Sequence, residues 1–209
     1  SVFPSDIRTV SQGFEFEAPL FDSIAPTTAG RWDQTGITGK ITYEADAFTV
    51  TSTSAYRDIE FEWLNDGDGL SDFLVVYYQK DFSDQFTQDI QITSNDDGPF
   101  NWIVGGFYLT ESATGLYAIP LGPAFGGITL AYDGNNETDA FGVFAEGTYE
   151  FGNGFRFTGG LRYSDEQKDA TADFRVFDGD PGFPQTPEVS SDAFTPRFIA
   201  RYKPTDDTM

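Results

Sequence analysis

Basic side chains recur at even spacings toward the C-terminal end of the sequence. They are Arg156 and Arg162 in one stretch, and Arg197, Arg201 and Lys203 in another. In an extended chain, residues an even number of positions apart lie on the same side. Guanidinium groups gathered on one face can bind an anionic ligand, because each offers several charged donors. The alternative is a solvated polar wall in which these cations pair with nearby acids.

Three aromatic residues form a second set of candidate contacts. Trp63, Tyr77 and Tyr78 lie within residues 58–84, a long acidic stretch that we predict to be a loop. Their rings can stack on a ligand, or they can pack within the loop and anchor it at an interface. Both interpretations stay open from the sequence alone.

Carboxylates are abundant, but their spacing does not favour catalysis. Asp165 and Glu166 are neighbours, as are Asp206 and Asp207, and neighbouring residues of a strand point to opposite faces. The sequence has no histidine and no cysteine, which removes disulfides, Cys/His zinc sites and histidine-dependent triads. We therefore expect no enzyme activity, no metal site and no cofactor.

The composition points away from nucleic acid and toward β-structure. The chain has 12 basic and 34 acidic residues and a formal net charge of −22, so it should repel phosphate, and we expect no nucleic-acid partner. Aromatic residues make up 17% of the sequence, a proportion typical of β-rich and membrane-interface proteins.

The stretch 138–168 shows how the strands are built. It predicts two strands joined by a tight turn at Gly152-Asn153-Gly154, where residues that tolerate positive φ are needed. One face of each strand is apolar and ends near a tyrosine, and the other face of the second strand is polar and basic. Strands of about ten residues with this pattern are typical of transmembrane β-barrels.

The same unit recurs along the chain. Strands are predicted at 35–43, 48–57, 85–94, 100–110, 138–168 (two strands) and 194–203. Short turns at 44–47, 95–99, 151–154 and 204–208 alternate with long connections at 58–84, 111–137 and 169–192. Outer-membrane barrels put short turns on the periplasmic side and long loops outside.

The fold prediction is therefore all-β: an antiparallel, up-and-down transmembrane β-barrel section of about seven strands with short periplasmic turns and long extracellular loops. Residues 1–30 are expected to be a loop or irregular segment, and residues 31–209 the partial barrel. An odd number of strands leaves open edges, so we expect a section of a larger barrel.

Five segments carry a resemblance to a known family. They are FTVTSTSAYRD (48–58), QFTQDIQITS (85–94), FNWIVGGFY (100–108), FRFTGGLRYSDEQK (155–168) and FTPRFIARYKPTDDTM (194–209). In order and spacing they resemble successive strands of TonB-dependent outer-membrane receptors. The sequence shows no TonB box, no plug domain and no closing strand, so the resemblance is to a fragment of the barrel.

The resemblance implies a fold and a set of partners. The family's fold is a barrel of about 22 strands with a plugged lumen. Its activity is uptake of a ferric siderophore, or sometimes of cobalamin or a glycan, driven by the TonB complex. The expected location is the outer membrane of a Gram-negative bacterium, with membrane lipid around the barrel and TonB acting through the plug. On this view Arg156, Arg162, Arg197 and Arg201 contact the ligand or the plug.

Two other functions remain as alternatives. The first is a soluble, acidic β-sandwich that binds carbohydrate; it predicts two packed sheets and solubility without detergent. The second is a β-sheet hydrolase that uses carboxylates, which the acid spacing does not favour. Neither alternative explains why short and long connections alternate.

Overall fold

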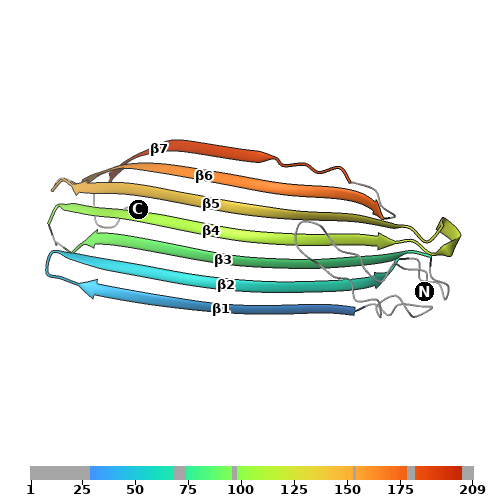
Figure 1. The fold of residues 1–209 in the computed structure, drawn as a ribbon. Helices are drawn as coiled ribbons and strands as arrows, with labels where there is room; N and C mark the ends of the chain where they lie inside the picture. The colour runs from blue at the N-terminus through green and yellow to red at the C-terminus, as the bar shows by residue number, and fades with distance from the viewer. Residues whose placement is uncertain (1–28, 68–73, 96–97, 153, 178–181, 204–209) are drawn as a thin grey trace.

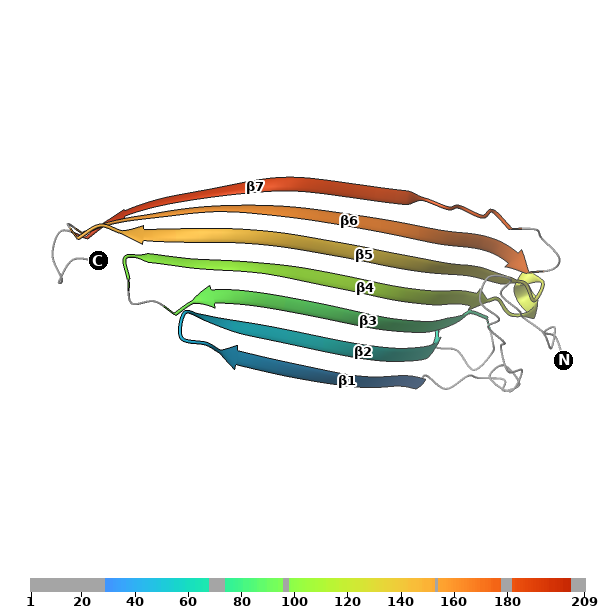
Figure 2. The same cartoon turned by 60° about the vertical axis from the view of Figure 1, so that its left-hand side comes forward.

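The computed structural model describes residues 29–67, 74–95, 98–152, 154–177 and 182–203. In this part of the chain, seven β-strands form one antiparallel sheet in which each strand pairs with the next (Figures 1 and 2). The strands are β1 (Ala29–Glu44), β2 (Phe48–Asp66), β3 (Val76–Ser94), β4 (Phe100–Pro120), β5 (Thr129–Glu150), β6 (Phe155–Phe177) and β7 (Glu188–Tyr202). No helix among these residues is long and apolar enough to span a membrane.

The predicted fold class is confirmed. The strand order β1 to β7 is that of an up-and-down barrel wall, and the sheet is open, with β1 and β7 as its edges. The described strands form one sheet rather than two packed sheets, which contradicts the β-sandwich alternative. The expected irregular segment 1–30 lies outside the described residues, except for Ala29 and Gly30, which belong to β1.

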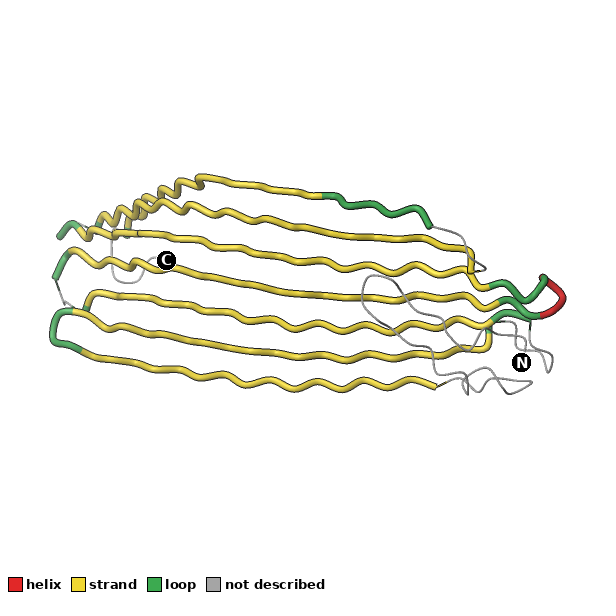
Figure 3. The backbone as a smooth tube through the Cα atoms, viewed as in Figure 1, coloured by secondary structure: helices red, strands yellow, loops and turns green. Residues whose placement is uncertain are grey.

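The long connections are shorter than predicted, and this is a correction. Between the strands they span residues 67–75, 121–128 and 178–187, and the second contains the short helix η2 (Pro123–Phe125) (Figure 3). Most of each stretch that the sequence predicted to be a loop continues the flanking strands instead. At 23 residues, β6 is about twice as long as a strand needs to be to cross a bilayer.

The tight turn between β5 and β6 forms as predicted. Gly154 has φ of 84°, and a Cβ there would clash with the carbonyl oxygen of Lys203. The amide of Phe151 donates to the carbonyl of Phe155 at 2.8 Å. The turn therefore requires a residue without a side chain at this position.

We call the half of each strand that is nearest the short turns the near half. In the near half the two faces of the sheet differ. One face carries a band of exposed apolar side chains, among them Ile41 at 73% exposure and Phe198 at 85%. We call this the outer face and the opposite one the inner face. On β5 the band runs from Phe141 to Tyr149, a length that fits the apolar height of a tilted membrane strand.

We call the other half of each strand, beyond the apolar band, the far half. There the distribution of side chains between the two faces reverses. Two residues past the last aromatic of the band, the same face carries an acid in five strands. The pairs are Tyr56/Asp58, Phe86/Asp84, Phe141/Asp139, Tyr163/Asp165 and Phe194/Asp192. The inner face changes in the opposite sense and becomes aromatic, with Phe61, Trp63, Tyr77, Tyr117, Tyr132 and Phe174.

The upper border of the band crosses the strands obliquely. Ile37, Tyr56 and Phe86 face one another in one row across β1–β3. The next border residues, Tyr108 and Phe141, lie two positions nearer the short turns, and those on β6 and β7 lie two positions nearer still. A level plane that cuts tilted strands produces this shift, as expected in a barrel wall.

The buried residues gather in the far half. Leu64, Val76, Tyr78, Leu116, Ala118 and Ala131 are buried at the ends of β2–β5, all on the outer face. Beside them lies a buried ionic cluster in which Arg175 Nη2 binds Asp133 Oδ1 at 3.0 Å and Arg175 Nε binds Asp173 Oδ2 at 2.8 Å. This packing holds together the ends of the strands that extend beyond the apolar band.

Candidate functional site

The structure places the four predicted arginines on the inner face of β6 and β7. Arg156 lies opposite Arg201 in the register, and Arg197 lies opposite Gly160. Arg162 is on the same face of β6, opposite Thr195. The shared face expected from the alternation is therefore present, in the near half of the sheet.

Three of these arginines have partners within the wall. Arg156 forms an ion pair with Glu150 of β5. Arg197 Nη1 donates to Glu146 Oε2 at 2.9 Å, and Arg162 Nε donates to Ser164 Oγ at 2.8 Å. Within the described part of the chain, Arg201 forms no such contact and faces the like charge of Arg156. Arg201 is thus the arginine of this set that remains open to a ligand or plug.

Glycines allow these long side chains to lie flat on the wall. Arg197 reaches Glu146 by crossing Gly160, where an added Cβ would lie 3.3 Å from Glu146 Oε2. The guanidinium of Arg162 lies over Gly142, whose added Cβ would be 3.4 Å from Nη2. We call these positions glycine slots, and Gly105 is a third.

Gly105 on β4 receives a ring instead of a guanidinium. A Cβ added there would lie 2.6 Å from the ring of Phe144, the residue opposite on β5. A long side chain over a glycine lies along the sheet rather than into the interior. The sequence alone does not reveal this arrangement, because it depends on which glycine faces which side chain.

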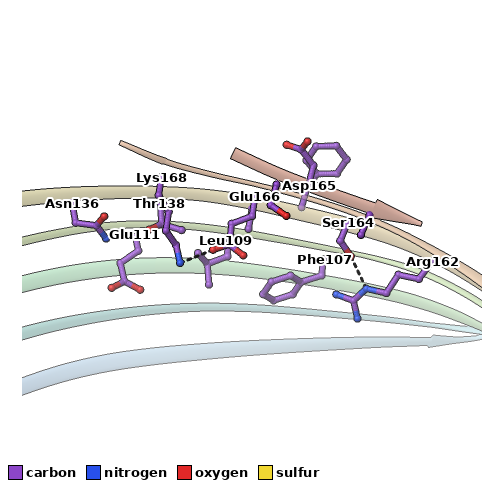
Figure 4. A pocket seen from close by; sticks show the side chains of 14 residues that line it. Phe107, Leu109, Glu111, Asn136, Thr138, Arg162, Ser164, Asp165, Glu166 and Lys168 are labelled. Atoms are coloured by element: carbon purple, nitrogen blue, oxygen red, sulfur yellow. Dashed lines mark hydrogen bonds and ion pairs between the residues drawn. The ribbon is translucent and has the colours of Figure 1, made fainter. Parts of the chain in front are cut away.

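A hollow of mixed charge and about 520 Å³, here the mixed-charge hollow, lies on the inner face of β4–β7 (Figure 4). Its lining includes two basic residues, Arg162 and Lys168, and three acidic residues, Glu111, Asp165 and Glu166. Lys168 Nζ binds Glu166 Oε1 at 2.6 Å. Lys168 and Glu166 were not predicted as site residues, although the even-position alternation of β6 continues through both.

The three candidate aromatics do not form one cluster, and the prediction that they lie in a loop is wrong. Trp63 is in β2, and Tyr77 and Tyr78 are in β3. Trp63 and Tyr77 lie on the inner face, whereas Tyr78 is buried on the outer face. In the far half the apolar residues lie on the inner face instead of the outer face, so the sequence pattern did not indicate that the strands continue there.

The surroundings of Tyr78 indicate that it stabilises the sheet. Its hydroxyl donates to Glu62 Oε1 at 3.0 Å. Tyr78 lies in the projecting end of β3, where burial and then the neighbouring Glu62 carboxylate raise the pKa of its phenol. The phenol therefore stays protonated and serves as a donor.

Within the described residues, no group of three or more acidic side chains is arranged to hold a metal ion. The inner face instead offers hydrogen bonds, ion pairs and aromatic surfaces. Such a wall can bind a solute.

Comparisons with known proteins identify the wall. The crystal structure of the ferric yersiniabactin uptake receptor FyuA from Yersinia pestis is similar over 86% of this chain, with a TM-score of 0.68 and 15% sequence identity. The chain spans 27% of that protein's length. At this identity the likeness concerns the fold. A search of curated proteins finds no match.

The family itself is shown by sequence. The model for the TonB-dependent receptor-like β-barrel matches residues 3–209. This is an outer-membrane protein family of Gram-negative bacteria. The open, seven-stranded sheet with its apolar outer band is consistent with that match. The chain belongs to the TonB-dependent receptor β-barrel family.

Proposed function

We propose that this chain is part of the wall of an outer-membrane receptor that imports a scarce solute with energy from the TonB complex. The observation that carries the proposal is the apolar band on the outer face, which ends at aromatic residues and gives way to aspartates. A surface of this kind is stable against lipid and unstable against water. We further propose that the protein has no enzyme activity.

The two open edges support a role within a larger barrel. An unpaired strand edge inside a bilayer leaves amide and carbonyl groups without partners, and each costs several kcal/mol, an amount on the order of a lost buried hydrogen bond. Further strands that pair with the open edge of β1 and the open edge of β7 remove that cost. A plug inside the barrel would face the inner wall, where Arg201 and the mixed-charge hollow offer charged groups.

The solute class expected from the resemblance is a ferric siderophore or a similarly scarce ligand. FyuA is named for uptake of ferric yersiniabactin, and this name supports that expectation without specifying the solute of the present chain. Arg162 in the mixed-charge hollow, together with Arg201, offers guanidinium groups that can bind an anionic chelate.

Cysteine labelling tests the placement of the wall. The 209 residues of this sequence contain no cysteine, so a single substitution is the one thiol that this part of the receptor contributes, and the receptor without the substitution is the control for any other thiol. In intact cells that carry the full-length receptor, Ser190→Cys on the outer face beyond the band should react with a membrane-impermeant maleimide. Ala47→Cys in a short turn should react only after the outer membrane is permeabilised.

Uptake tests the activity. A host without its own receptors, supplied with the full-length receptor, should accumulate a labelled solute only when TonB is present. Candidate solutes are ⁵⁵Fe-loaded siderophores and labelled oligosaccharides. Equal accumulation with and without TonB would contradict the proposal, and reaction of Ala47→Cys in intact cells would contradict the orientation.

A further inference from the structure

The edge strand β7 contains a proline in its interior. Two prolines lie within the strands that the structure describes: Pro120 is the last residue of β4, and Pro196 lies midway along β7. Proline has no backbone N–H, so it cannot donate a hydrogen bond to a neighbouring strand. In sheets it is confined to edge strands, to the first residue of a strand or to bulges. The side to which Pro196 turns its nitrogen therefore decides which pairing it affects.

The pairing of β7 with β6 shows which backbone groups of β7 face the open edge. Hydrogen-bonded and non-hydrogen-bonded residue pairs alternate along an antiparallel ladder. The amide of Lys203 donates to the carbonyl of Gly154 at 2.9 Å, and at the other end of the ladder the amide of Ala170 donates to the carbonyl of Pro187 at 2.9 Å. The odd-numbered residues of β7 are therefore hydrogen-bonded to β6, and the even-numbered residues direct their backbone groups to the open edge.

Pro196 is an even-numbered residue, so its nitrogen points away from β6. It faces Leu161 of β6 in the register as a non-hydrogen-bonded pair. Its side chain lies on the outer face, between Phe194 and Phe198 of the apolar band. The missing N–H therefore lies at the depth of the membrane, where water from the lipid side cannot replace a lost hydrogen bond.

The open edge of β1, at the other side of the sheet, has no such interruption (Figure 1). The amide of Ala45 donates to the carbonyl of Phe48 at 2.9 Å, so the odd-numbered residues of β1 are those hydrogen-bonded to β2. The even-numbered residues from Gly30 to Glu44 face the open edge, and none of them is proline. The edge of β1 thus offers an N–H at every position, whereas the edge of β7 does not.

A strand that pairs with β7 is left with one carbonyl that has no donor. The residue opposite Pro196 can donate its own N–H to the Pro196 carbonyl, but its carbonyl meets the proline ring where a hydrogen would otherwise lie. We propose that the contact between β7 and the following strand is a weak seam of the barrel wall, which opens locally more readily than the other strand pairs of the band. The inference rests on the proposed function, because it requires a further strand beside β7.

The inner side of the weak seam is polar. Thr195 and Arg197, the two neighbours of Pro196, lie on the inner face and line a hollow of about 290 Å³. Arg197 Nη1 donates to Glu146 Oε2 of β5 at 2.9 Å, so this long side chain extends away from the seam. Water in the lumen can then reach the carbonyl that lacks a donor, and a bridging water lowers the cost of local opening.

Hydrogen exchange at single amides of the full-length receptor in lipid vesicles tests the weak seam. The amides of Phe194 and Phe198 face the seam, and in the wild type they should exchange at least about tenfold faster than those of Thr195 and Arg197, which are bonded to β6. Pro196→Ala restores the missing donor. It should slow exchange at Phe194 and Phe198 by about tenfold and leave exchange at Thr195 and Arg197 unchanged.

Two further variants separate an effect on the seam from a general change in the barrel. Thr38 lies in the middle of β1 and directs its N–H to the open edge, so Thr38→Pro creates the same defect there. It should speed exchange at the neighbouring edge residues Gly36 and Lys40 by about tenfold. Pro120→Ala, which removes the proline at the end of β4, should leave exchange in β7 unchanged.

Two results would overturn the inference. One is equal protection of the seam-facing and β6-bonded amides in the wild type, which would mean that the seam is closed despite the proline. The other is exchange at Phe194 and Phe198 that does not change in Pro196→Ala. Both results are read from receptors that retain the proline or replace it with alanine, so they do not depend on whether Thr38→Pro folds.

Failure of this inference is distinguishable from failure of the proposed function. A receptor that imports its solute through TonB while all amides of β7 are equally protected would contradict the weak seam and leave the transport proposal intact. A receptor that shows the expected exchange but imports nothing would support the seam and contradict transport. Absence of protection at every even-numbered residue from Ser190 to Tyr202 would show that no strand pairs with β7, and would contradict both.

Discussion

The near and far halves of the sheet share the same strands but distribute their side chains in opposite ways. In the near half the outer face is apolar and the inner face carries arginines, threonines and acids. In the far half the outer face is acidic up to the buried apolar residues at the ends of β2–β5, and the inner face carries aromatic rings. Side chains alternate between the two faces along the whole of each strand, but the face that carries the apolar side chains changes from one half to the other.

This contrast shows that the surroundings, and not the strand, determine which face is apolar. Lipid selects apolar side chains outside the near half. Water outside the far half allows acids there, and the aromatic rings of that half lie on the inner face instead. The hydrogen bond from Tyr108 to Asp139 Oδ1, at 3.0 Å, links the last aromatic row of the band to the acidic row beyond it.

The largest expected effect tests the far half. Arg175 has an 8% exposed side chain between the buried Asp133 and the half-buried Asp173, so Arg175→Met leaves both acids without their cation. Breaking such a buried pair costs about 3–5 kcal/mol. Hydrogen exchange of the full-length receptor should show strong loss of protection at the far ends of β5 and β6, and unchanged protection near the short turns. Uniform loss along both strands would mean that the halves are not independent.

A charge in the band tests the near half. Ala145→Arg puts a cation midway between Phe141 and Tyr149 on the outer face and should destabilise the receptor in lipid vesicles by about 2–4 kcal/mol. Gln167→Arg, on the same face of β6 but beyond the band, is the matched control and should change stability by less than about 1 kcal/mol. Urea titration of the refolded receptor measures both. Equal effects would remove the distinction between the halves.

Two neighbouring glycines test the packing of the inner wall. A Cβ at Gly105 would lie 2.6 Å from the Phe144 ring and 2.9 Å from the carbonyl oxygen of Ile90, so Gly105→Ala should cost about 1–3 kcal/mol. At Gly106, on the outer face, the nearest atoms are 3.7 Å away, and Gly106→Ala should be close to neutral. The same urea titration compares the two, and similar costs would argue against the glycine slot.

The smallest effect concerns charge repulsion on the outer face. Glu137, Asp169 and Glu188 face one another in one row across β5–β7. Like charges directly opposite destabilise a sheet, so Asp169→Asn should stabilise the receptor by about 0.2–1 kcal/mol at low salt. The gain should fade near 1 M salt, where the Debye length is about 3 Å. A gain that persists in high salt would point to a cause other than charge.

Sequence reasoning recovered the near half well. Alternation in stretches such as 100–110 and 155–168, together with the turn at Gly154, was enough to place the seven strands and their fold class. The same reasoning ended β2 at Arg57, because the next residues are acidic on the outer face. The apolar residues Ile59, Phe61 and Trp63 continue the alternation, but on the inner face.

The site was only partly predictable, because it depends on register. Arg197 was recognised as a residue of the polar face, but its contact with Glu146 requires Gly160 to lie between them. Likewise, Arg175 meets Asp133 only because the register of β5 and β6 places Ala131 opposite Arg175. Residues that are so distant in sequence give no local signal of being neighbours.

The glycine slots have a consequence for movement along the wall. Side chains that project into a passage must change rotamer when something passes, and each change adds a barrier. Over Gly105, Gly142 and Gly160, the long side chains already lie parallel to the sheet. At these positions the inner surface consists of side chains that lie against the backbone, so it is lower and smoother there than where side chains project from the wall.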